Sequence, residues 1–346
     1  MLAKGQVERC TRICAYAALI LILSLQRPTM AQNLDPFYKG KTIQIIVGNT
    51  TGTGFDLYAR AVAQYMSKYI PGQPTLVVSN MPGASGLRAM QFLTSGAAKD
   101  GTIIATFNSN LVNLSLLEPE ATKNIDIDGF NWLASLASDT KACFSWSQSG
   151  VTRLDDLKTH KLIIGSSGRG SGDIFGTILN RLYGSNVQIV LGYGTNPDVW
   201  LAFEKGEASG NCTGWSVIPQ RKPDWIRDNK VSLLVQFAKT PAASMPNVPL
   251  IYDLPMEEEL RAAIAFMTQA DGFVRPFAAP AGVPQERLEI LHKAFDALVK
   301  DADFLDFAAK SSMDIDYMNG AALAASVHDI RNTPAAAVEL ARKVSK

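Results

Sequence analysis

Short apolar runs alternate with glycine-bearing loops and amphipathic segments along the first half of the chain. Residues 42–47 and 75–78 are apolar, largely β-branched runs, each followed by a glycine-rich loop and a segment with helical periodicity, and a third short run covers residues 103–107. Runs of this kind are typical of buried strands, and the segments between them of helices. The pattern predicts strand, loop and helix in repeated order.

The same layout recurs in the middle of the chain, with strands at residues 162–165 and 187–191 and a short strand with a polar tail within residues 207–220. The spacing agrees as well, because Gly48 and Asp56 are eight residues apart, as are Gly165 and Asp173. Strand and helix alternation favours parallel or mixed sheets with helices on both faces, joined by right-handed crossovers. The sequence therefore predicts an α/β protein with two similar units.

The C-terminal third lacks this repeat. It contains a strand-like run at residues 272–280 and several amphipathic segments, so we expect it to cover a sheet formed earlier in the chain. We predict that the chain leaves domain 1 near residue 138, builds domain 2 over residues 139–236 and returns. Domain 1 would then comprise residues 32–138 and 237–346, with residues 131–138 and 233–238 as two hinge strands.

The first 31 residues have the features of a secretory signal peptide. A basic start precedes the apolar residues 13–25, and Thr29 and Ala31 offer small side chains at the −3 and −1 positions of a cleavage site. The apolar run is shorter than the roughly 20 residues of a spanning helix, which favours cleavage after Ala31 over an uncleaved membrane anchor. Removal takes away four basic residues and one acid, leaving 29 against 31 and a net charge near −2. This balance gives no reason to expect nucleic acid as a partner.

Two cysteines, Cys143 and Cys212, remain after residue 31. Export places them in an oxidising compartment, where they can form a disulfide, and two separate buried thiols are the alternative. Neither segment has metal-ligand or C-x-x-C spacing, and no other cluster of metal-binding residue types occurs, so we expect no metal and no cofactor.

The loop at residues 48–56 carries several glycines and threonines and no lysine. A helix start offers unpartnered N–H groups and a partial positive charge, and glycines let an anion approach them. Asp56 would cap the helix or orient the loop. The loop completes neither the Walker pattern nor the dinucleotide fingerprint, which argues against a nucleotide-binding site. Glycines that serve only the turn are the other alternative to an anion-binding loop. Similar loops at residues 80–87, 165–173 and 192–200 also follow strands, so we expect them at the ligand-binding edges of the sheets.

Catalytic chemistry has little support in the sequence. No G-x-S-x-G motif occurs, and we interpret the three histidines, His160, His292 and His328, as surface or packing residues. We therefore expect a protein that is not an enzyme.

The motifs "IIVGNTTGTGFDLYAR" and "NMPGASGL", with "KDGTIIATF" and "RPFAAPAGVPQERLEIL", resemble the Bug receptors, the extracytoplasmic solute-binding subunits of tripartite tricarboxylate transporters. The resemblance extends from about residue 36 to 340. It implies a two-domain periplasmic-binding-protein fold of type II-like architecture, a periplasmic monomer, a small organic carboxylate as ligand and membrane permease subunits as partners. A ligand sensor for a signalling partner and an enzyme on the same scaffold are the alternatives.

The resemblance also implies a ligand site between two glycine loops of each domain. In domain 1 the implied contacts are Thr51, Gly52, Thr53, Asp56, Pro82, Gly83 and Ala84. In domain 2 they are Ser166, Ser167, Gly168, Ser171 and Asn196. The segments around Cys143 and Cys212 resemble the paired cysteine segments of one branch of the family. The chain departs from most members at Thr51, Thr53 and Ser85, which leaves the identity of the carboxylate open.

Overall fold

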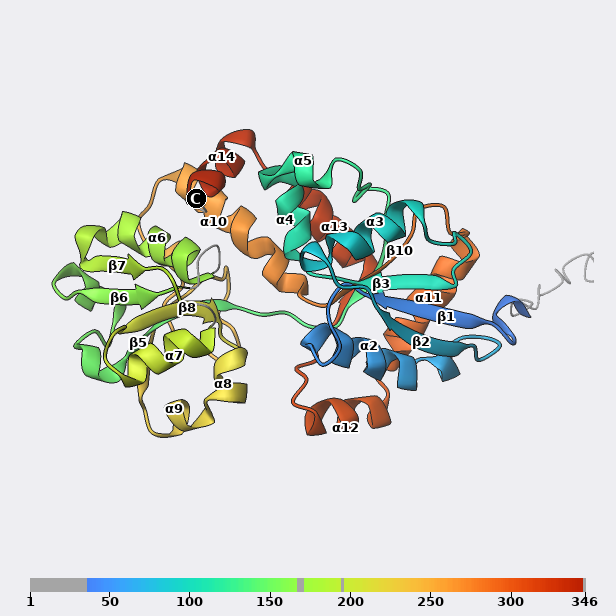
Figure 1. Cartoon of the computed structure of the whole chain (residues 1–346), viewed down its shortest axis with the longest axis horizontal. Coiled ribbons are helices and arrows are strands. Elements are labelled where there is room, and N and C mark those ends of the chain that lie inside the picture. The colour runs from blue at the N-terminus through green and yellow to red at the C-terminus, as the bar shows by residue number, and fades with distance from the viewer. Residues whose placement is uncertain (1–35, 167–170, 194–195, 345–346) are drawn as a thin grey trace, which may run out of the picture. The chain divides into compact units, whose positions relative to one another are not determined.

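The computed structural model describes residues 36–166, 171–193 and 196–344 of the 346-residue chain. The elements below lie within the unit Tyr38–Lys346. Two sheets with flanking helices make up this unit (Figure 1).

The first sheet has six strands in the order β11-β4-β10-β3-β1-β2. β1 pairs in parallel with both β2 and β3, whereas β10 runs antiparallel to β3 and β4, and β11 is antiparallel to β4. The strands are β1 (Thr42–Val47), β2 (Thr75–Asn80), β3 (Ile103–Thr106), β4 (Asn131–Ser135), β10 (Pro276–Ala279) and β11 (Met318–Asn319).

The second sheet has five strands in the order β7-β6-β8-β5-β9. β6 pairs in parallel with β7 and β8, and β5 is antiparallel to β8 and β9. The strands are β5 (Lys141–Trp146), β6 (Leu162–Gly165), β7 (Val187–Val190), β8 (Gly210–Gly214) and β9 (Val231–Gln236). The predicted mixed sheets of a two-unit α/β fold are confirmed.

Helices cover both faces of the sheets, as predicted. Figure 1 shows α2 and α3 on opposite sides of the first sheet. Around the second sheet, α6 packs against β6 and β7. Phe203 of α7 joins an aromatic cluster with Phe144 of β5 and Trp225. The longer helices are α2 (Gly54–Tyr65), α3 (Leu87–Ser95), α4 (Asn110–Leu117), α6 (Ser171–Tyr183), α7 (Asn196–Glu204), α10 (Glu258–Gln269), α11 (Gln285–Leu298), α12 (Ala302–Lys310), α13 (Gly320–Arg331) and α14 (Ala335–Val344). The shorter ones are α5 (Pro119–Thr122), α8 (Val217–Arg221) and α9 (Pro223–Arg227).

The C-terminal third does more than cover the first sheet. Its helices α11 and α13 pack against β4, as expected of a cover, but β10 lies inside the sheet between β3 and β4. Its Phe277 is fully buried and pairs with Thr106 at the end of β3. The start of β10 therefore meets the edge at which β3 ends.

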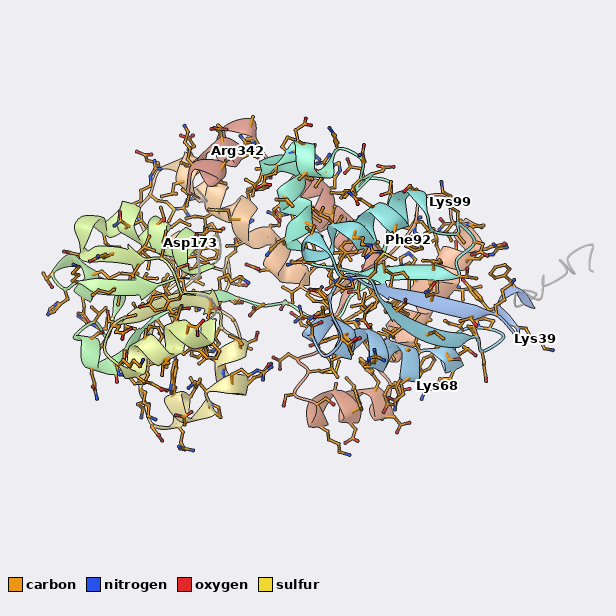
Figure 2. All side chains as sticks on the ribbon, viewed as in Figure 1. Lys39, Lys68, Phe92, Lys99, Asp173 and Arg342 are labelled. Carbon is orange, nitrogen blue, oxygen red and sulfur yellow. A yellow bond between two sulfur atoms is a disulfide. The ribbon has the colours of Figure 1, made fainter. Side chains whose placement is uncertain are left out.

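A buried aspartate fixes the start of α12. Asp301 accepts hydrogen bonds from the N–H groups of Asp303 (2.8 Å) and Phe304 (3.1 Å), from the Tyr69 hydroxyl, and from Lys68, which Figure 2 labels. The hydrogen bonds from Lys68 and Tyr69 lower the pKa of Asp301 well below its usual value. The charged carboxylate thus stabilises the folded chain at any pH above the ordinary pKa of about 4.

We expect Asp301→Asn to lower the free energy of unfolding by about 1–2 kcal/mol at pH 7, because the cap geometry is kept and the charge is lost. The folded-state pKa is depressed, so the difference from the wild type is full above pH 5 and shrinks as the pH falls below about 4. Urea unfolding at pH 7 and pH 3.5 measures it. The matched control is Asp303→Asn, since that side chain is 80% exposed; equal losses for both variants would contradict the prediction.

Candidate functional site

Asp56 holds the first glycine loop in place. Its carboxylate is almost fully buried and accepts hydrogen bonds from the Gly52 N–H (2.9 Å), Arg60 Nε (2.9 Å) and Asn80 Nδ2 (3.0 Å). Burial alone raises the pKa of Asp56, but these hydrogen bonds outweigh it, so that the pKa lies below its usual value. Of the two roles predicted for Asp56, the structure supports orienting the loop, because the N-cap residue of α2 is Thr53.

The first turn of α2 keeps its N–H groups available. The Thr53 hydroxyl donates to the Thr50 carbonyl (2.9 Å) and caps no N–H group of the helix. The first backbone hydrogen bond of α2 runs from the Leu57 N–H to the Thr53 carbonyl. Helix geometry leaves the N–H groups before Leu57 without an intrahelical acceptor. Thr51 is exposed and donates to Asn80 Oδ1 (3.1 Å). The structure thus brings Thr51, Gly52, Thr53 and Asp56 together.

The second loop, between β2 and α3, packs beside the first. Met81 N–H donates to the Val47 carbonyl (2.7 Å), and a Cβ added to Gly48 would lie 3.0 Å from Gly86 Cα. The predicted contacts Pro82, Gly83 and Ala84 are exposed in this loop. Gly83 has φ +150°, a conformation that side chains rarely adopt, which explains the glycine there.

Arg275 lies at the same edge, and the sequence analysis missed it. Its guanidinium lies 4.4 Å from the Phe55 ring centroid and 5.4 Å from that of Tyr58, and Nη1 donates to the Val274 carbonyl (2.9 Å). A Cβ on Gly54 would be 2.8 Å from Nη2. The glycine-loop pattern points to segments that follow strands, whereas Arg275 precedes β10, whose start reaches this edge because the strand is antiparallel.

A cavity of about 460 Å³ lies against the start of α2, a volume within the range of small-molecule sites. Its walls include Gly52 and Thr53 of the first loop, Arg275, and Gln220 of α8. The remaining residues around it are Gly54, Leu57, Tyr58, Ala137, Ser138, Asp139, Ser216, Val217, Arg221, Val274, Ser311, Ser312, Met313 and Asp314. Pro82, Gly83, Ala84 and Ser166 are not part of this wall.

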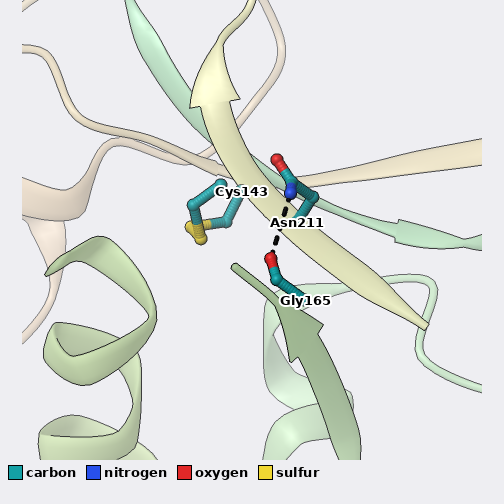
Figure 3. The surroundings of a disulfide bond; sticks show 4 residues. Cys143, Gly165 and Asn211 are labelled. Atoms are coloured by element: carbon teal, nitrogen blue, oxygen red, sulfur yellow. Dashed lines mark hydrogen bonds between the residues drawn. A yellow bond between two sulfur atoms is a disulfide. The ribbon is translucent and has the colours of Figure 1, made fainter. Parts of the chain in front are cut away.

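The predicted contacts of the second unit are only partly described. Ser166 follows β6, is buried, and donates a hydrogen bond to Asp173 Oδ1 of α6 (3.0 Å; Figure 2 labels Asp173). Asn211 on β8 donates to the neighbouring Gly165 carbonyl (3.1 Å; Figure 3). Ser167 and Gly168 lie outside the described residues. Ser171 begins α6 and Asn196 begins α7, but their side chains also lie outside.

The predicted disulfide is present. Cys143 and Cys212 are register partners on β5 and β8, with Cα atoms 4.0 Å apart, and both are buried (Figure 3). Among residues 36–166, 171–193 and 196–344, no group of three or more His, Cys, Asp or Glu side chains could hold a metal ion. None of the helices in that same part of the chain has the length and apolar character needed to cross a membrane.

Comparisons with known proteins agree with the resemblance noted in the sequence. No protein-family model matches the chain. A UPF0065 protein of Bordetella bronchiseptica is 25% identical over 306 residues, covering 86% of this chain and 83% of that protein. A second, from Cupriavidus necator, is 25% identical over 327 residues, covering 92% and 90%.

Three solved structures share the fold. A TctC solute binding protein from Polaromonas has a TM-score of 0.66 at 17% identity, over 89% of this chain and 98% of that one. The periplasmic binding protein BugD has a TM-score of 0.57 at 17% identity, over 89% and 98%. MatC from Rhodopseudomonas palustris, with bound malate, has a TM-score of 0.54 at 20% identity, over 88% and 99%. These comparisons confirm the resemblance to Bug receptors and the periplasmic-binding-protein fold.

Proposed function

We propose that this chain is a periplasmic receptor that captures a small carboxylate and delivers it to the permease of a tripartite tricarboxylate transporter. In this proposal residues 1–31 are a cleaved signal peptide, domain 2 covers residues 139–236, and the protein is a monomer without catalytic activity. The twelve predicted contacts of the two units, Ser167, Gly168, Ser171 and Asn196 among them, form the ligand site.

One observation carries the proposal: a cavity of ligand size adjoins the start of α2, where Thr53 leaves the helix N–H groups uncapped. Such a helix start binds an anion through N–H groups and the helix dipole, without a covalent step. The fold supports it, because the solved protein with bound malate shares the architecture. Micromolar affinity corresponds to about 8 kcal/mol, which three to five charge-assisted hydrogen bonds can supply against the cost of ordering.

A thermal-shift screen tests the proposal. The panel contains mono-, di- and tricarboxylates, malate included, with neutral amides of matched size as controls. A ligand at 100 times its Kd stabilises by about 2.7 kcal/mol, so a bound acid raises Tm by about 5–10 °C. A protein that no acid stabilises, or that converts the acid into a product, would contradict the proposal.

Gly83→Val tests whether the second loop belongs to the ligand site. A Cβ here would lie 3.3 Å from Arg88 Cβ, and valine is strained at φ +150°, so the exposed loop has to move. We expect the acid-induced Tm shift to be lost while the circular dichroism spectrum is kept. Gly83 does not line the cavity of about 460 Å³, so its part in binding depends on this test. An unchanged acid-induced Tm shift would exclude this loop from the ligand site.

A further inference from the structure

Arg275 is a partly buried cation beside the positive end of a helix. Its Nη2 lies next to Gly54, the first residue of α2, and its guanidinium packs over the Phe55 ring. The first turn of a helix carries a partial positive charge, so the two features repel each other when nothing lies between them. Burial adds to this cost and lowers the pKa of Arg275 below its usual value.

The described part of the chain offers little to offset that cost. No carboxylate in it lies within 4.0 Å of the guanidinium, and the buried Nε has no hydrogen-bond partner there. Asp139, which also lines the cavity, attracts Arg275 from beyond that distance and works against the lowering of its pKa. It is shared with other groups, because its Oδ1 accepts the Thr140 N–H (2.9 Å) and its Oδ2 lies 3.6 Å from the Lys141 ammonium. Asp314 is exposed, and its backbone carbonyl accepts a hydrogen bond from the Tyr58 hydroxyl (2.6 Å).

An anion in the cavity would reverse the balance. A carboxylate placed between the guanidinium and the first-turn N–H groups is attracted by both, and arginine presents donors in a planar fork that matches two carboxylate oxygens. Cation–π contacts with the Phe55 and Tyr58 rings hold the guanidinium in position for this contact.

We propose that Arg275 pairs with the ligand carboxylate in this cavity and makes the receptor select acids over neutral solutes of the same shape. This inference rests on the proposed function and deepens it by naming a residue that pairs with the charge of the ligand.

Arg275→Met removes the charge and keeps much of the apolar stem. Isothermal titration with malate, adipate and adipamide measures binding, and thermal unfolding without ligand measures stability. We expect affinity for the acid that binds the wild type to fall about 10- to 100-fold, the effect of one charge-assisted hydrogen bond. Without ligand, Tm stays level or rises, because a partly buried charge with no carboxylate within 4.0 Å has been removed.

Arg261→Met is the matched control. Arg261 lies 5.9 Å from the Tyr252 ring centroid and donates to the Tyr252 carbonyl (2.7 Å), so it makes the same kinds of contact away from the cavity. We expect this variant to lose stability and to bind the acid as the wild type does. Arg275→Lys keeps the charge without the fork and should bind between the wild type and Arg275→Met.

The outcomes separate this inference from the proposed function. The inference is overturned, and the receptor function stands, if Arg275→Met binds the acid with an affinity within threefold of the wild type. The same holds if the Tm of Arg275→Met without ligand falls as that of Arg261→Met does and Arg275→Lys binds the acid no better than Arg275→Met. A wild type that binds none of the acids of the larger screen overturns both.

Discussion

Replacing Lys141 by methionine is expected to lower the free energy of unfolding by about 3–5 kcal/mol at pH 7. Lys141 begins β5, and its ammonium lies 2.8 Å from Asp271 Oδ1 and 3.6 Å from Asp139 Oδ2. Asp271 is 5% exposed, and its other oxygen has no hydrogen-bond partner among the described residues. Without Lys141, a buried carboxylate loses the cation that offsets its desolvation.

Urea unfolding at pH 7 measures this loss. Lys161→Met is the matched control, because Lys161 is exposed immediately before β6, and we expect a change within about 0.5 kcal/mol. In Lys141→Met/Asp271→Leu both charges are gone, and apolar residues of similar volume can replace a buried ion pair at little cost. We therefore expect the double variant to recover most of the lost stability; a double variant as unstable as Lys141→Met would contradict the role given to Asp271.

The pH dependence of the Lys141→Met variant follows from Asp271. Burial raises the pKa of Asp271 above its ordinary value even though Lys141 lowers it, and removing Lys141 raises it further. A carboxyl with a raised folded-state pKa weakens the fold at pH values above its unfolded pKa, so acidification relieves the penalty. The deficit of the variant should be smaller at pH 5 than at pH 8, and equal deficits at both would show that Asp271 is not its source.

The strands of the repeated units could be predicted because their signal is local. β1, β2, β6 and β7 are short β-branched runs bounded by turn residues, and each is found where the pattern placed it. The position of β10 inside the first sheet could not be predicted, because it depends on pairing Phe277 with Thr106, 171 positions earlier in the chain. Arg275 escaped the sequence analysis for the same reason, since only that pairing brings it to the edge where β3 ends.

In the candidate site, too, local features could be predicted and long-range contacts could not. Gly52, Thr53 and Asp56 come together because they lie in one strand-loop-helix connection, and the sequence identified them. Whether Asp56 caps the helix or orients the loop depended on Asn80, which reaches it from the neighbouring strand β2. The ligand contacts predicted in both units remain predictions.

Removing the disulfide with Cys143→Ala/Cys212→Ala is expected to cost about 4–5 kcal/mol in the free energy of unfolding. The two cysteines are 69 positions apart, and in the chain-entropy view a cross-link over such a loop restricts the unfolded chain by about 4 kcal/mol. Both sulfur atoms also occupy buried positions in the second sheet, so alanine leaves unfilled volume. Denaturant unfolding of the oxidised wild type and of the double variant measures the difference.

Reduction separates the cross-link from packing. With a thiol reductant present during unfolding, the wild type should lose most of its advantage, whereas the double variant should be unaffected. Because Cys143 and Cys212 are 0% and 1% exposed, a thiolate reaches the bond only after β5 and β8 separate, so reduction of the folded protein should be slow and should accelerate in denaturant. A wild type that is reduced rapidly under native conditions without loss of stability would show that these strands are held together by their hydrogen bonds and packing alone.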